Sequence, residues 1–196
     1  MSSQYEVLTG RLTGKVILIV GATSGIGRAV ALRIADERAI VVVAGRRADL
    51  GAQVCDDVIS VGGQAVFTRS DATQEDDVAA AVALAIDKFG HLDGAVNNAG
   101  GVLAAGPLAD LPAADWQAEL DLNLNSVFFG LKHQIPAIHA AGGGAIINNA
   151  STQASQRCPD SPHTARPITV WSDSPNRRRW NGPIAESAST PSSPAT

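Results

Sequence analysis

The feature that most constrains this chain is a regular alternation of short apolar runs and longer helical stretches. Helical periodicity marks residues 25–37, 48–60, 74–89 and 113–141. Parallel neighbouring strands need crossover connections, so this alternation predicts an α/β doubly wound parallel sheet covered on both faces. Apolar runs, expected to be strands buried on both faces, lie at residues 15–20, 39–44, 64–68, 92–96 and 145–148.

Composition limits the classes of protein to which the chain can belong. Its 196 residues, 45% of them hydrophobic, are enough for one sizeable core. The net charge of −4 gives no reason to expect a nucleic-acid partner, and no apolar run reaches the roughly 18–20 residues of a membrane span. The start "MSSQYEVLTGRL" lacks the order of a signal peptide, so we expect a cytoplasmic protein with no membrane partner. Cys55 and Cys158 are expected to be free thiols, and no metal site is indicated.

The turn after the first expected strand, "VGATSGIGRAV", carries Gly21, Gly25 and Gly27 directly ahead of a helix. Glycines let a backbone turn sharply and approach a pyrophosphate, and the helix N-terminus offers unpaired N–H groups to the anion. Glycine also marks ordinary turns. The position between a strand and a helix nevertheless favours a dinucleotide-binding bend, because ligands of such sheets gather at the carboxyl ends of the strands.

Three motifs occur in order along the chain: "GKVILIVGATSGIG" at 14–27, "NNAG" at 97–100 and "LDLNLNSVFFG" at 120–130. Together they make residues 11–152 resemble the short-chain dehydrogenase/reductase (SDR) family, with Val20 in the place where the family usually has Thr. The resemblance implies a Rossmann-like sheet that binds NAD(H) or NADP(H). It also implies hydride transfer between the nicotinamide and a small carbonyl or alcohol substrate.

The same resemblance implies a set of cofactor-binding residues. Among them, Asp71 resembles the family's adenine-contacting Asp, whereas composition alone would make it the N-cap of the following helix. The two roles are compatible. The complete set is Gly21, Thr23, Ser24, Gly25, Ile26, Gly27, Arg46, Arg47, Asp71, Ala72, Asn97, Ala99 and Gly100.

The residues after the second expected strand bear on which coenzyme would bind. Enzymes that use NAD(H) place an acidic side chain there for the ribose 2′-OH, whereas the 2′-phosphate of NADP(H) requires a cation. This chain has Gly45 at that place, followed by Arg46 and Arg47. The pattern favours NADP(H) over NAD(H). One alternative is open, that Arg47 is only a solvated surface residue.

For catalysis, the resemblance implies an Asn, a Ser and a Tyr-x-x-x-Lys pair. The Tyr exchanges the proton, the Lys lowers the Tyr pKa, the Ser fixes the substrate oxygen and the Asn supports a water relay. Asn123 and Ser151 match the Asn and the Ser. A polar amide on an otherwise apolar helix face is also hard to explain by packing, which supports a functional role for Asn123.

The Tyr-x-x-x-Lys pair has no match. His163 and Thr164 stand where the tyrosine is expected, Tyr5 is the only tyrosine, and Lys132 is the last lysine. His163 can in principle move a proton, but its Pro-rich surroundings offer nothing to orient it. We therefore expect an oxidoreductase by descent with low or no activity. The alternative is a nucleotide-binding remnant without turnover.

The sequence changes character after "IINNAS". Residues 153–196 hold most of the ten prolines and only scattered apolar residues, so they cannot offset the entropy of ordering. We expect a Rossmann domain over 1–152 and a largely disordered Pro/Ser/Arg-rich tail over 153–196. "RRRW" at 177–180 is too short a basis for a nucleic-acid patch.

A shift of reading frame explains the tail. When the last base of each codon is read with the first two bases of the next, Trp180 and Asn181 necessarily encode Glu. Allowed codons over 179–191 then spell L-E-W-A-D-R-G-V-R-V-N-A, which resembles a segment of the family. We infer a frameshift between about residues 153 and 162. Pro167 and Ile168 cannot give the expected Lys in that frame, so a second change and a pseudogene are also open.

The tail bears on how complete the fold is. In the family, the segments that it replaces carry the next helix and further strands. The sheet is therefore expected to be incomplete at its C-terminal side, with an exposed edge strand that promotes aggregation. The homo-oligomer interface usual in the family is expected to be lost.

Overall fold

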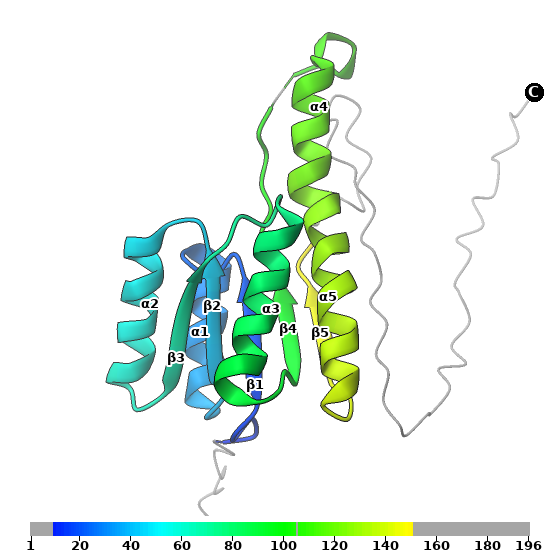
Figure 1. Ribbon diagram of the computed structural model, residues 1–196. Helices are drawn as coiled ribbons and strands as arrows, with labels where there is room; N and C mark the ends of the chain where they lie inside the picture. The colour runs from blue at the N-terminus through cyan, green and yellow to red at the C-terminus, as the bar shows by residue number, and fades with distance from the viewer. Residues whose placement is uncertain (1–9, 105, 151–196) are drawn as a thin grey trace, which may run out of the picture.

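The computed structural model of the protein describes residues 10–104 and 106–150. Within them, one sheet of parallel strands has the order β3-β2-β1-β4-β5. β2 and β3 lie on one side of β1, and β4 and β5 lie on the other (Figure 1). The strands are β1 (Val16–Val20), β2 (Ile40–Gly45), β3 (Gln64–Arg69), β4 (Gly94–Asn97) and β5 (Ala145–Asn148).

Helices cover both faces of this sheet, as the alternation predicted. α1 packs beside α2 on one face, and α3 packs beside α5 on the other (Figure 1). The α/β doubly wound, Rossmann-like fold class is thereby confirmed. The α-helices are α1 (Gly25–Asp36), α2 (Ala48–Ser60), α3 (Glu75–Phe89), α4 (Ala113–Leu120) and α5 (Ser126–Ala140).

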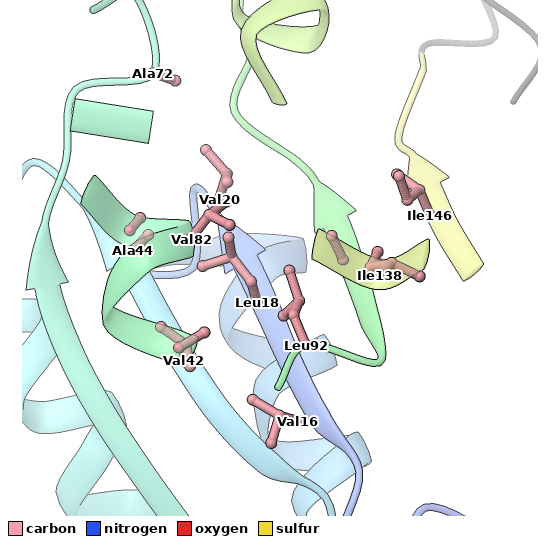
Figure 2. Close-up of a cluster of buried hydrophobic side chains, with 13 residues drawn as sticks. Val16, Leu18, Val20, Val42, Ala44, Ala72, Val82, Leu92, Ile138 and Ile146 are labelled. Carbon is pink, nitrogen blue, oxygen red and sulfur yellow. The ribbon is translucent and has the colours of Figure 1, made fainter. Parts of the chain in front are cut away.

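Two hydrophobic clusters share the central strands because successive strand residues point to opposite faces. Val16, Leu18 and Val20 of β1 face α3 and α5, where they pack with Val82 and Ile138 (Figure 2). The alternate residues of β1 and β2 pack with α1 and α2 in the second cluster. Burial on both faces is what makes these strands almost purely apolar.

The long helix expected over 113–141 differs from the structure at its centre. A π-helical turn, Asp121–Asn125, separates α4 from α5, although the two continue as one rod in Figure 1. Such a turn disturbs the usual hydrogen-bond ladder. Side chains satisfy carbonyls of the disturbed turn: Ser126 Oγ donates to the Leu122 oxygen at 2.6 Å, and Asn123 Nδ2 donates to the Glu119 oxygen at 3.1 Å.

The expectation that all strands are buried on both faces was wrong for the outer two. β3 is largely half-buried, and in β5 Ile146 is 8% exposed whereas Ile147 is 59% exposed. Each lies at an end of the sheet order, where one neighbouring strand is lacking among the described residues. The predictions about residues 153–196, including disorder, concern a segment outside the described residues. No helix in the described part of the chain is long and apolar enough to cross a membrane.

Candidate functional site

A cleft of about 680 Å³ lies at the carboxyl ends of the strands, where the sheet order reverses on either side of β1. This is the position at which doubly wound folds bind ligands. Residues that follow each of the five strands contribute to its wall. The cleft is lined by Gly21, Thr23, Ser24, Ile26, Gly45, Arg46, Arg47, Ser70, Asp71, Ala72, Asn98, Ala99, Gly100, Gly101, Leu122, Asn123, Asn149 and Ala150.

The glycine bend after β1 brings two backbones into contact. Gly21 has a φ of +85°, and a Cβ there would lie 2.6 Å from the Ala99 nitrogen. A Cβ on Gly27 would lie 2.2 Å from the Gly21 carbonyl oxygen. Neither position accepts a side chain without movement of the main chain. The glycines therefore seat the start of α1 directly against the ends of β1 and β4.

The N-terminus of α1 suits an anion. Its first turn contains no acidic residue, and the Ser24 side chain at the N-cap makes no capping hydrogen bond. The N–H groups of a first helical turn lack intrahelical acceptors and carry the positive end of the helix dipole. Gly25 has a φ of +55°, and a Cβ there would meet nothing within 4 Å. The residues present therefore fit a diphosphate group.

Arg47 is fixed against the same turn. Its Nη2 donates to Ser24 Oγ at 2.6 Å and to Thr23 Oγ1 at 3.1 Å. The alternative that Arg47 is only solvated is therefore wrong, because two hydroxyls of the glycine bend hold its guanidinium beside the cleft. Arg46 also lines the cleft. Two cations thus border the space next to the end of β2.

Asp71 lines the cleft beyond β3, but it does not cap α3. That helix begins at Glu75 with Gln74 at its N-cap, so the N-cap interpretation was wrong. Asp71 Oδ1 instead accepts hydrogen bonds from the Thr73 backbone nitrogen at 3.0 Å and from Thr73 Oγ1 at 2.9 Å. This local turn competes with helix formation and delays the start of α3.

Asn123 lies in the π-helical turn and lines the cleft. Its Oδ1 accepts the Gly101 N–H at 3.0 Å, and its Nδ2 donates to the Gly101 carbonyl at 2.9 Å. The amide thereby pairs with both backbone groups of one residue in the loop after β4. Asn123 is held in place, and it is at the cleft wall on the β4 side of β1.

The two adjacent asparagines of "NNAG" have different roles. Asn97 is only 4% exposed and pairs with Gln134 and Asn148, away from the cleft lining. Asn98 lines the cleft and donates from Nδ2 to the Gly21 carbonyl at 2.9 Å. Asn97 is the last residue of β4, so its side chain follows the strand alternation into the α5 face.

Comparison with known proteins shows to which family the chain belongs. The family model of short chain dehydrogenases matches residues 15–163. The chain belongs to the short-chain dehydrogenase (SDR) family. Among curated relatives, the cyclohexanol dehydrogenase of Acinetobacter sp. (strain SE19) is 38% identical over 146 residues, covering 74% of this chain and 58% of the relative. The 7alpha-hydroxysteroid dehydrogenase of Escherichia coli (strain K12) is 38% identical over 148 residues, covering 75% and 57%.

Solved SDR structures match the same part of the chain. A 7alpha-hydroxysteroid dehydrogenase complexed with NADH and 7-oxo glycochenodeoxycholic acid has a TM-score of 0.72 at 38% identity, covering 76% of this chain and 57% of that one. An NADH-dependent reductase complexed with NAD has a TM-score of 0.67 at 33% identity, covering 73% and 62%. These relatives are named dehydrogenases and reductases, as the family match leads one to expect. The chain spans less than two thirds of the length of each.

The structure brings most of the predicted SDR site residues together in one cleft. Gly25 and Gly27 shape the bend without lining the cleft, Asn97 lies away from it, and Ser151 is outside the described residues. Sequence reasoning missed Asn98 and Asn149, whose side chains bond to each other at 2.8 Å. Their position just past the ends of β4 and β5 is the signal that could have identified them. Those brought together are Gly21, Thr23, Ser24, Ile26, Arg46, Arg47, Asp71, Ala72, Ala99, Gly100 and Asn123.

Proposed function

We propose that this SDR chain binds a nicotinamide dinucleotide in the cleft, with NADP(H) preferred over NAD(H), at a site derived from oxidoreductases of small carbonyl or alcohol substrates. The observation that carries the proposal is the placement of Arg47. Its guanidinium is fixed on Ser24 and Thr23, within the same cleft as the uncapped start of α1. The helix start would receive the diphosphate and the arginine the further phosphate, which are the anionic groups that NADP(H) carries.

The glycine at position 45, where an acidic side chain would contact the ribose 2′-OH, supports the same preference. A Cβ on Gly45 would lie 2.6 Å from Thr23 Cγ2, so a carboxylate there would require Thr23 to move. Arg46 and Arg47 instead offer donors suited to a phosphate, and no acid at position 45 repels it. NADH and NAD occur in the two related structures, and those coenzymes are properties of those proteins.

The strand order supports a direction for the dinucleotide in the cleft. Asp71 and Ala72 follow β3, on the same side of β1 as the arginines, and would hold the adenine end. Ala99, Gly100 and Asn123 lie on the β4 side and would border the nicotinamide. The bound nicotinamide supplies hydride chemistry. The main-chain groups of the bend and α1 bind and orient it, and the Asn123 amide holds the adjoining loop in place.

Reduction of a carbonyl also needs a group that supplies a proton. General acid–base catalysis needs a titratable group within hydrogen-bond reach of the reacting oxygen. Asn123 is an amide that does not titrate, and His163 and Thr164 occupy the place of the family tyrosine in the sequence. We therefore propose that turnover is low. A nucleotide-binding role without turnover is the second candidate, and the missing tyrosine and lysine favour it.

Titration of purified full-length chain with NADPH and NADH, followed by coenzyme fluorescence, tests the coenzyme assignment. We expect NADPH to bind at least about tenfold more tightly, a difference of ~1.4 kcal/mol. Arg47→Gln should remove most of that preference without weakening NADH. Arg28→Gln, which removes a positive charge from α1 at an exposed pair with Asp57, is the matched control. Equal affinities in the unmodified chain would contradict the preference, and no binding of either coenzyme would refute the site.

Oxidation of NADPH with a panel of small ketones and aldehydes distinguishes the two candidates. Binding without turnover supports the nucleotide-binding role. Slow turnover that Asn123→Ala reduces further supports the impaired oxidoreductase. Turnover comparable to that of complete family members, at about 1–10³ s⁻¹, would show that another residue serves as the acid and would contradict the impairment.

A further inference from the structure

Glu119 is a buried carboxylate whose contacts the site described so far does not explain. It lies in the last turn of α4 and is 6% exposed. Its Oε1 accepts two successive backbone N–H groups of the loop after β4, from Leu103 at 2.6 Å and from Ala104 at 2.9 Å. An ionised carboxylate that is taken out of water must be compensated, and hydrogen bonds from backbone amides provide that compensation.

The second oxygen of the same carboxylate reaches the cleft wall. Glu119 Oε2 accepts a hydrogen bond from Asn123 Nδ2 at 2.8 Å. Asn123 in turn pairs with both backbone groups of Gly101, at 3.0 and 2.9 Å. Glu119 therefore contacts the two ends of one short stretch, Leu103 and Ala104 directly and Gly101 through Asn123.

This geometry requires a carboxylate rather than an amide. Among the described residues, two backbone N–H groups donate to Oε1 of Glu119 and one side-chain NH₂ donates to Oε2. A glutamine keeps one acceptor oxygen for Leu103 and Ala104, but its NH₂ would then face the NH₂ of Asn123. Asn123 cannot relieve this by turning over its amide, because both Gly101 contacts would then join like groups.

We propose that Glu119 is a positioning residue, which fixes the orientation of the Asn123 amide and clamps the loop 101–104 onto α4 at the nicotinamide end of the cleft. The significance for coenzyme binding rests on the proposed function. The clamp itself does not, because it is a property of the described chain without ligand. It gives a physical reason for a charged residue at a buried position on the same rod as α5.

Hydrogen exchange and NMR on the coenzyme-free full chain test the clamp. In Glu119→Ala, the amides of Leu103 and Ala104 should exchange at least about tenfold faster, because each loses its buried acceptor. In Glu119→Gln, those two amides should keep most of their protection, while the side-chain NH₂ resonances of Asn123 shift and exchange faster. This split between loop and side chain is a signature that a merely space-filling residue would not give.

Asp121→Asn is the matched control, because it removes one negative charge from the adjoining turn. Within the described part of the chain, Asp121 Oδ1 accepts hydrogen bonds from Gln117 Nε2 at 2.9 Å and Asn125 Nδ2 at 2.7 Å, both on the same rod. It should leave the loop amides and the Asn123 resonances unchanged. If Glu119→Ala fails to fold, as judged by circular dichroism, the Glu119→Gln pattern alone decides. Unchanged Asn123 resonances in Glu119→Gln, or equal effects in Asp121→Asn, would overturn the proposal.

Coenzyme titration of the same variants separates this proposal from the function on which it rests. If the unmodified chain binds NADPH, Glu119→Ala should weaken binding by about threefold to tenfold, and Asp121→Asn should not. If the unmodified chain does not bind NADPH, the proposed function fails, and the exchange data still support or overturn the clamp. Unaltered NADPH affinity in a folded Glu119→Ala that has lost loop protection would overturn its link to the cleft.

Discussion

Asn97 and Gln134 form a reciprocal pair of side-chain amides in the interior. Asn97 Nδ2 donates to Gln134 Oε1 at 3.0 Å, and Gln134 Nε2 donates to Asn97 Oδ1 at 2.8 Å. Gln134 is 0% exposed. The same Asn97 Nδ2 also donates to Asn148 Oδ1 at 2.9 Å, so one amide joins the ends of β4 and β5 to α5. This network lies just inside the sheet edge from which the cleft opens.

Breaking this pair should destabilise the fold. Gln134→Leu leaves the side-chain oxygen Oδ1 of Asn97 buried without the donor from Gln134, at a cost of about 1–3 kcal/mol. Gln134→Glu should cost more at pH 7, because the new carboxylate would be buried and could only accept hydrogen bonds. Urea unfolding at equilibrium measures both. Gln117→Leu, on the exposed face of α4, is the control and should stay within about 0.5 kcal/mol. Equal free energies of unfolding for all three variants would contradict a stabilising role for the pair.

Gly27→Ala should destabilise the chain even though Ala favours helices. Propensity alone would make this change stabilising by about 1 kcal/mol. The new Cβ would meet the Gly21 oxygen at 2.2 Å, and overpacking against backbone costs about 1–3 kcal/mol or more. Ala29→Gly, at an exposed site on the same helix, measures the effect of helix propensity alone on the free energy of unfolding. Thermal unfolding should show both variants to be less stable. A stabilised Gly27→Ala would mean that the bend and the helix separate readily.

The sequence predicted the elements well because their periods are local properties. Apolar runs and helical spacing located the five strands of the described sheet and the starts of α1 to α4 to within a few residues, but not the break between α4 and α5. What it could not predict depends on neighbours in space. The family resemblance already implied an exposed edge at β5. The exposure of β3 was not predicted, because it depends on the position of β3 at the other end of the sheet order, which the local pattern of residues 64–68 does not contain.

In the candidate site, too, some features follow from local sequence and others depend on neighbours in space. The glycine bend and the arginines after β2 were predicted from residue type and position. The choice between Asn97 and Asn98 depends on where β4 ends, and boundaries are set by pairing with Val20 and Asn148. Nothing local in "DLNLN" distinguishes a π-helical turn from an α-helix, because the turn is maintained by side chains that cap its carbonyls, among them Ser126. Glu119 was missed because a charged residue inside a helix usually faces water.

Acid should weaken the anchoring of the segment before β1. The side-chain hydrogen bond from Arg11, followed by the Arg11 backbone N–H, lowers the pKa of Glu37 from 4.5 to about 2. A folded-state pKa below the unfolded value means that this stabilisation is present above pH 4.5 and is lost as the pH falls toward 2. Arg11→Gln should therefore be less stable than the unmodified chain at pH 7, and the difference should shrink progressively as the pH falls toward 2.

Urea titrations at pH 7, 4 and 2.5 measure that convergence. Lys88→Gln removes a positive charge from an exposed position at the end of α3 and should change the free energy of unfolding by less than about 0.5 kcal/mol at pH 7. A difference between Arg11→Gln and the unmodified chain that is constant across the three pH values would show that Glu37 ionisation is not involved.

Solubility should respond oppositely to lysine at two adjacent positions in β5. Ile147 is 59% exposed on the last strand of the described sheet, so Ile147→Lys should reduce self-association with little loss of stability, because charged side chains on edge strands block further pairing. Ile146, at 8% exposed, packs with Ala95 and Ile138 in the core cluster. Ile146→Lys should abolish cooperative unfolding. Light scattering at matched concentration and thermal melts measure the two effects. If Ile147→Lys aggregates as readily as the unmodified chain, the β5 edge does not drive association.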